Sequence, residues 1–195
     1  MEVSPELQSL EKLLSRQRAI RRFTAEPVPD ELVERILDAA THAPSARNIQ
    51  PWRFIVVRDE AAKARLGAIF DELGRQLYGA NAPDRTPWTE VPLLVVVCSE
   101  YAFGQTESGI AALGASIYPA VQNLLLAVQA AGLGAVLTTR WKARETEVRP
   151  LLGLPHEMTV HAIIPIGWPD RRYGRNHRTP SVEFTSRERF GQPWR

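Results

Sequence analysis

The sequence predicts a single domain that combines α-helices with buried β-strands. Its 195 residues suit one domain with a substantial hydrophobic core. Short apolar runs alternate along the chain with longer segments in which apolar residues recur at helical spacing. No shift in composition marks a second unit, so we expect one domain over residues 1–195.

The N-terminal half predicts three helices, one strand and a long loop. Leucines at helical spacing indicate a helix over Pro5–Arg18, and Asp30 is a suitable N-cap for a second, amphipathic helix. An apolar run indicates a strand over Trp52–Val57, and a helical pattern follows from about Glu60 to Leu77. Residues 78–92 are rich in Pro, Gly, Asn and Asp, which predicts a surface loop on the substrate side of the domain.

The C-terminal half predicts three more strands and two helices. The longer helix, Gly109–Ala131, is apolar on almost every side, and Pro119 should kink it or mark its restart. A helix of this kind must be buried all round, and a domain of this size offers few places for one except a subunit interface. The remaining elements are expected at Leu93–Cys98, Ala135–Thr139, Ala143–Leu152 and Thr159–Ile166.

The C-terminal segment, residues 168–195, is polar and arginine-rich with only scattered apolar residues. Such a segment cannot bury itself alone, so it must lie across another surface if it is ordered.

Composition narrows the class of protein. The formal charge of +2 is too small to predict nucleic-acid binding. Cys98 has no partner for a disulfide, the N-terminus has no signal-like pattern, and no apolar run has the length of a membrane span, so we expect a cytoplasmic protein. The four histidines have no partner at ligand spacing, which argues against a metal site.

The stretch Ala43–Trp52 carries an unusual set of neutral polar side chains. Ser45, Asn48 and Gln50 lie between prolines in a helix-to-strand connection. Their donors and acceptors suit a flat, neutral heterocycle, whereas the simpler alternative is that they satisfy the backbone of their own loop.

Two other segments could bind a ligand, and each has a simpler explanation. The arginines of Arg18–Arg22 could hold a phosphate through their guanidinium forks, or could be a solvated helix end. Thr138 and Thr139 could present hydroxyls and amides to a ligand, or could be ordinary strand residues. The sequence contains no dinucleotide fingerprint, Walker loop or nucleophile elbow.

Together and in order, these segments resemble the nitroreductase family of flavoenzymes. The resemblance spans roughly residues 16 to 195, and the segments that carry it are 18–23, 28–32, 43–52, 121–127, 132–134, 151–155, 165–169 and 178–180. They read RAIRRF, VPDEL, APSARNIQPW, VQNLLLA, GLG, LLGLP, PIGWP and RTP.

The resemblance implies an α+β fold with three α/β/α layers, in which helices flank a central mixed, largely antiparallel sheet. It also implies an intertwined homodimer, with the C-terminal arm on the partner subunit and non-covalently bound FMN at the interface. NAD(P)H would be the co-substrate and a small electron-poor molecule the acceptor. The residues it places at the cofactor are Arg18, Ala19, Arg21, Leu137, Thr138, Thr139 and Arg178, together with Pro44, Ser45, Asn48 and Gln50, which reach the flavin from the partner subunit.

The implied reaction is ping-pong hydride transfer from NAD(P)H through FMN N5 to a nitroaromatic or quinone. It requires no side chain as general acid or base, so we predict no catalytic residue. Gln17 and Ala19 stand where many members have arginine and serine. Some members have an acidic residue near Thr139, whereas this chain has a neutral hydroxyl, as the deiodinase-like branch of the family also does. Two alternatives remain: another FMN reaction (dehydrogenase, dehalogenase or oxygen-dependent), or a non-catalytic interaction module.

Overall fold

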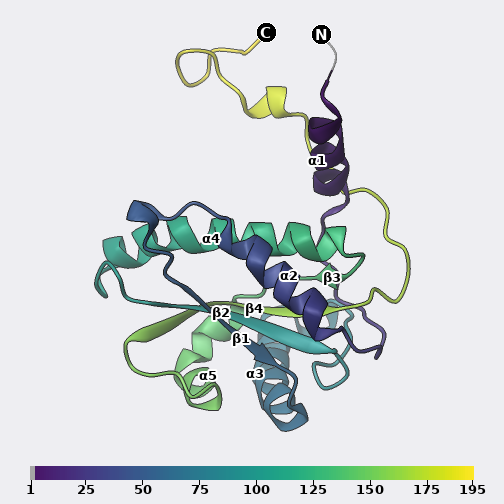
Figure 1. Cartoon of the computed structure of the whole chain (residues 1–195), viewed down its shortest axis with the longest axis vertical. Coiled ribbons are helices and arrows are strands. Elements are labelled where there is room, and N and C mark those ends of the chain that lie inside the picture. The colour runs from purple at the N-terminus through teal and green to yellow at the C-terminus, as the bar shows by residue number, and fades with distance from the viewer. Residues whose placement is uncertain (1–2) are drawn as a thin grey trace.

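The computed structural model describes residues 3–195 and has three layers, with a four-stranded sheet between two pairs of helices (Figure 1). One face of the sheet carries α2 and α4, and the other carries α3 and α5. The α+β class and the antiparallel sheet predicted from the sequence are confirmed. The helices are α1 (Pro5–Arg16), α2 (Asp30–Thr41), α3 (Glu60–Tyr78), α4 (Glu107–Ala130) and α5 (Glu145–Leu151). The strands are β1 (Trp52–Val57), β2 (Leu93–Glu100), β3 (Gly134–Ala135) and β4 (Met158–Gly167).

The sheet has the order β1-β2-β4-β3, and all three strand pairs are antiparallel. β2 and β4 are the two central strands, and their side chains are buried on both faces, which explains their continuous apolar sequences. The register between them shifts at Val97/Cys98, so that His161 is the extra residue of a β-bulge in β4.

Two helix boundaries differ from the sequence prediction for identifiable reasons, and one expected interruption inside a helix is absent. α1 ends at Arg16 because Gln17 is extended and the following residues bridge to β3. Asp30 is not the N-cap of α2: Pro29 takes that position, and the Asp30 carboxylate instead accepts a hydrogen bond from Arg58 at 2.7 Å. α4 continues through Pro119 without a break.

The expected strand Ala135–Thr139 is wrong in its C-terminal part, since β3 contains only Gly134 and Ala135. The register would place Val136 opposite Pro165, which has no N–H to donate. Regular pairing therefore stops, and contact with β4 resumes only at the isolated bridge between Thr138 and Ile163.

α4 packs only one side against its own chain. On the inner side of the helix, its Leu113, Ile117 and Leu124 are fully buried, whereas its Ala111 and Ala115 on the outer side are exposed. By length and composition alone α4 could cross a membrane. Its inner side is packed like that of a core helix. Its outer, apolar side is exposed to solvent in the single chain.

α1 and the C-terminal segment project from the body of the domain, and both chain ends lie on that side (Figure 1). α1 buries none of its residues, and its Leu7, Leu10 and Leu14 are each more than 40% exposed. The C-terminal segment exposes Phe184 and Phe190. Both segments therefore carry apolar side chains that the single chain leaves in solvent.

Candidate functional site

A pocket of about 200 Å³ lies between α3, the loop 78–92 and the segment that follows β3. Three arginines, Arg21, Arg85 and Arg140, line it together with aromatic side chains and the backbone of 136–139. Loop 78–92 contributes to its wall, but the loop is less open than its composition predicts. Trp88 is 3% exposed and Val91 is fully buried.

The segment Arg18–Arg22 is held against β3 by close packing. Ile20 is buried, and its N–H donates to the Ala135 carbonyl at 2.9 Å. A Cβ at Gly134 would lie 2.6 Å from Ile20 Cγ2, so only glycine allows this approach. The side chains of Arg18 and Arg21 are left exposed, and no carboxylate of residues 3–195 lies within 4.0 Å of either guanidinium.

Thr138 and Thr139 have different roles: the polar groups of Thr138 are used within the chain, whereas Thr139 is accessible to a ligand. The Thr138 hydroxyl donates to the Ile163 carbonyl at 2.6 Å, and the Thr138 carbonyl accepts from the buried Trp141 indole at 2.9 Å. The Thr139 side chain is exposed and lines the pocket. Of the two hydroxyls that the sequence suggested, Thr139 is therefore the one available to a ligand.

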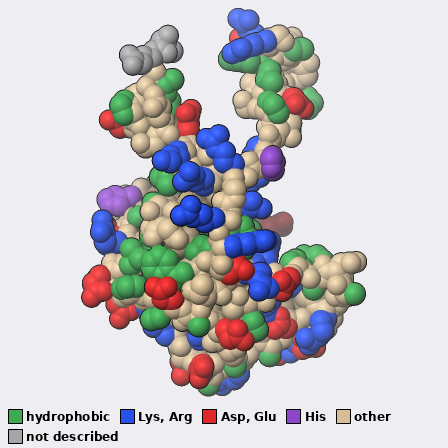
Figure 2. Space-filling view, turned by 90° about the vertical axis from the view of Figure 1, so that its right-hand side faces the viewer, with side chains coloured by type: hydrophobic (Ala, Val, Ile, Leu, Met, Phe, Trp, Pro, Cys, Tyr) green, Lys and Arg blue, Asp and Glu red, His purple; other side chains and the backbone are tan. Residues whose placement is uncertain are grey.

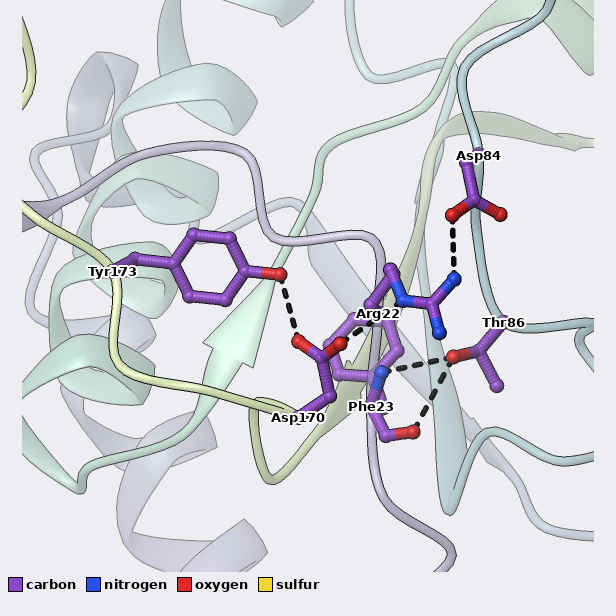
Figure 3. A network of polar contacts seen from close by, with 6 residues as sticks. All are labelled: Arg22, Phe23, Asp84, Thr86, Asp170 and Tyr173. Carbon is purple, nitrogen blue, oxygen red and sulfur yellow. Dashed lines mark hydrogen bonds and ion pairs between the residues drawn. The ribbon is translucent and has the colours of Figure 1, made fainter.

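Loop 78–92 is tied to the arginine segment by a polar network (Figure 3). Thr86 Oγ1 accepts from Phe23 N–H at 2.9 Å, and Thr86 N–H donates to the Arg21 carbonyl at 2.9 Å. Arg22 forms ion pairs with Asp84 of the loop and with Asp170 after β4. A hydrogen bond from Tyr173, together with Arg22, lowers the pKa of Asp170. The pocket wall and the segment carrying Arg21 are thus mechanically connected.

The stretch Ala43–Trp52 lies elsewhere, beside the N-terminal half of α4 (Figure 1). Ser45 Oγ accepts from Gln50 N–H at 3.1 Å, so this hydroxyl does serve its own loop. Arg47, Asn48 and Gln50 all have positive φ, which is costly for residues other than glycine and is concentrated at functional sites. Neither Asn48 nor Gln50 lines the pocket.

The structure therefore brings together some predicted cofactor residues and separates others. Arg21, Leu137, Thr138 and Thr139 share the pocket, whereas Ala19 bridges to Ala135 in β3 and Arg18 lines a separate, smaller hollow between β3 and the C-terminal part of α4. Pro44, Ser45, Asn48 and Gln50 are remote, and Arg178 lies in another hollow with His177 and Glu183. Sequence reasoning missed Phe70, Arg85, Trp88 and Arg140, because no motif marks them and only the fold gathers them.

Comparison with known proteins identifies the family. Residues 14–168 match the nitroreductase family. An NADH dehydrogenase of Thermus thermophilus is 30% identical, with 85% of this chain and 89% of the relative covered. An iodotyrosine deiodinase of Thermotoga neapolitana is 31% identical, with 87% and 95% covered.

A solved structure gives the same answer at the level of the fold. The crystal structure of oxidized iodotyrosine deiodinase bound to FMN and 3-iodo-L-tyrosine superimposes with a TM-score of 0.71 at 30% identity, covering 88% of this chain and 95% of that one. The family expected from the sequence is thereby confirmed, and the chain belongs to the nitroreductase family.

Proposed function

We propose that the protein transfers hydride from NAD(P)H, through FMN, to a small electron-poor acceptor such as a quinone or nitroaromatic, in a ping-pong reaction. Family membership makes the chain an FMN-dependent NAD(P)H oxidoreductase. The observation that carries the specific proposal is that Arg21 and Leu137–Thr139, far apart in sequence, line one pocket.

The residues present fit FMN in their chemistry. Arg18 and Arg21 are exposed cations without a carboxylate partner within the described chain, as a phosphate and a polarised pyrimidine edge require. Arg18 also lies 5.7 Å from the Tyr173 ring, in a strongly basic region. Lys and Arg side chains gather on this face (Figure 2), and one hollow is lined by Arg16, Arg171, Arg172 and Arg175.

The site is proposed to be completed by a second copy of the chain. Ala46 N–H donates to Ser116 on α4, whereas the arginine segment meets β3 just beyond the C-terminal end of that helix. The 14 residues from Ser116 to Ala130 span about 21 Å at 1.5 Å per residue. A homodimer in which two α4 helices pack antiparallel would bring Asn48 and Gln50 of one chain to Arg21 of the other, and would cover the exposed side of α4.

In this arrangement FMN supplies the redox chemistry, accepting and returning hydride at its N5 atom. The chain supplies binding and orientation. Arg18 and Arg21 would hold the phosphate and the pyrimidine edge, and Thr139 would offer a neutral hydroxyl from the wall of the pocket. The carboxamides of Asn48 and Gln50 match the donors and acceptors of a neutral ring system. Buried aromatic residues under the pocket restrict the entry of water.

The visible spectrum of the purified protein is the first test. We expect flavin absorbance, or uptake of added FMN, followed by consumption of NADH or NADPH that depends on a quinone. Arg18→Ala should release FMN and remove this turnover. A colourless protein that takes up no FMN would overturn the proposal and favour an interaction module, whereas an Arg18→Ala variant fully loaded with FMN would show only that the phosphate site is misplaced.

Reductive dehalogenation is a second candidate. It is favoured by the neutral Thr139 and by the similarity to a deiodinase over 95% of that relative's length. Release of iodide from 3-iodo-L-tyrosine by the reduced protein, at a rate above that with a quinone acceptor, would favour this reaction.

A further inference from the structure

We propose that Arg140, supported by Arg85, forms an anion subsite that selects acceptors carrying a carboxylate on an aromatic ring. The proposal rests on the proposed function for its place in a reaction, and it concerns the half of the pocket to which neither the sequence nor the family assignment gives a role.

The Arg140 guanidinium packs against α3 at the wall of the pocket. Its Cζ is 3.9 Å from the centroid of the Phe70 ring and 5.3 Å from that of Tyr78. No carboxylate of residues 3–195 lies within 4.0 Å of it. Aromatic contacts hold the group in place, but they leave its hydrogen-bond donors free for a ligand.

The helix makes room for this guanidinium at one position. Gly74 lies within α3, and a Cβ there would be 2.2 Å from Arg140 Nη1. Glycine in a helix interior costs about 1 kcal/mol relative to alanine. The helix is therefore less stable at the position where it makes room for Arg140.

Positive charge in the pocket exceeds what the chain itself neutralises. Arg85 lies 5.0 Å from the same Phe70 ring and forms an ion pair with Asp71, while Arg21 and Arg140 have no such partner among the described residues. No Asp or Glu of residues 3–195 lines the pocket. Burial, and secondarily the charge of Arg140, lower the pKa of Arg85 to about 10. An incoming anion would relieve this mutual repulsion.

The surroundings indicate an aromatic anion. Phe70 and Trp88 stack with centroids 4.5 Å apart and form an apolar floor, and Thr139 precedes Arg140 directly in the chain. A carboxylate fits the guanidinium fork in two parallel hydrogen bonds. An acceptor held this way would place its ring beside these aromatic residues and its reducible group toward Thr139. The simpler alternative is that Arg140 only packs α3 against the segment after Thr139.

A matched pair of acceptors separates these roles. The ratio of kcat/KM for 4-nitrobenzoate to that for 4-nitrobenzamide is measured in the FMN-loaded wild type and in Arg140→Met, which keeps the apolar stem without the charge. The two acceptors differ in reduction potential, but this difference contributes equally to the ratio in every variant. It therefore cancels when the ratios of two variants are compared. Losing a charged hydrogen-bond partner should lower the ratio about tenfold. Arg75→Met, the same change at an exposed position of α3, should leave the ratio unchanged.

Gly74→Ala tests position without removing charge. Its Cβ must displace the Arg140 guanidinium, so the ratio should fall in this variant as well. Calorimetric Kd values for 4-nitrobenzoate and 4-nitrobenzamide provide a readout that needs no turnover, and the preference for the anion should disappear in Arg140→Met. It should also weaken as salt is added.

The outcomes distinguish the two proposals. A binding preference for 4-nitrobenzoate that is lost in Arg140→Met, without any turnover, supports the anion subsite and overturns the oxidoreductase proposal. The anion subsite alone is overturned if Arg140→Met turns over and keeps two quantities within about twofold of wild type: the ratio of kcat/KM values and the ratio of Kd values for the two compounds. The loss of a charged hydrogen bond predicts a larger change in both. An unchanged ratio in Gly74→Ala overturns the placement of the anion beside α3.

Discussion

The two ends of α4 are built differently. Beyond its C-terminal end, Ile20 packs closely on Gly134, Trp141 is fully buried, and the hydrogen bonds of Thr138 are made inside the chain. Beside its N-terminal half, the stretch Ala43–Trp52 contains three residues with positive φ and leaves most of its polar side chains exposed.

The difference indicates which half of the site is finished in one chain. Backbone strain of this kind costs about 1–3 kcal/mol per residue and persists only where the surroundings enforce it. Within one chain, the enforcement around Asn48 includes the bond from Gln50 to Ser45 and the bond from Ala46 to Ser116. A partner chain and a bound ligand would supply the remainder, whereas the pocket end needs neither to keep its shape.

The largest effect is expected when the exposed side of α4 is blocked. Ala115→Arg places a charge on the apolar surface that we propose to be the dimer interface, where it would be buried without a partner. We expect a monomer by light scattering and a loss of FMN affinity of about 1,000-fold or more, which is about 4 kcal/mol. Ala64→Arg on α3 is the matched control and should remain dimeric and yellow. A monomeric variant that still holds FMN tightly would contradict a site shared between chains.

A complementation experiment addresses the two ends directly. Arg18→Ala damages the pocket end, and Asn48→Ala damages the other end. If each site uses one end from each chain, either variant alone should be inactive. Chains unfolded together and refolded should recover about a quarter of the wild-type sites, because half of the dimers are mixed and each has one intact site. No recovery, with mixed dimers demonstrated by mass spectrometry, would place both ends in the same chain's site.

The elements that the sequence predicted well are those in which local pattern and tertiary packing agree. β1 begins and ends where the apolar run Trp52–Val57 does, because its register with β2 buries the ends of that run. β3 was predicted too long. Its apolar sequence contains no information about the opposite strand, where Pro165 faces Val136 and cannot donate a hydrogen bond. α1 was predicted for its leucine spacing, yet none of them is buried in the single chain.

The site was predictable only where a motif marks it. Arg21 and Thr139 could be named from the ordered segments of the family. Arg85 and Arg140 could not, because a loop and a helix end of ordinary composition carry them, and only the fold sets both against Phe70. The separation of Asn48 from Arg21 within one chain was expected only from the resemblance, in which Asn48 reaches the flavin from the partner subunit, since sequence order alone carries no information about which chain completes a site.

A buried histidine beside the N-terminal half of α4 should make the stability of the fold sensitive to acid. His161 lies in a hollow beside Ala111 and Tyr118, and its Nε2 is 2.8 Å from Ser99 Oγ. Burial, and secondarily Lys142, lower the pKa of His161 to about 4. The unfolded chain, with a pKa near 6.5, therefore binds more protons between these values, and stability is lost as pH falls through this range.

His161→Gln should remove this sensitivity. Between pH 7 and pH 4.5 the wild type should lose about 2–3 kcal/mol more free energy of unfolding than the variant does. Urea unfolding at one fixed protein concentration measures the difference. Equal losses in both proteins would mean that the folded protein protonates His161 as readily as the unfolded chain does.

The smallest effect concerns the strain itself. Arg47 has φ of 53°, a conformation that glycine adopts without a steric penalty. Arg47→Gly should raise the free energy of unfolding by up to about 1 kcal/mol, since the relieved strain exceeds the added entropy of the unfolded chain. Arg65→Gly, at an exposed position inside α3, is the matched control and should lower it by about 1 kcal/mol, because glycine weakens a helix interior. If both variants lose stability equally in urea, the positive φ at Arg47 stores no strain, and the contrast between the two ends of α4 would rest on exposure alone.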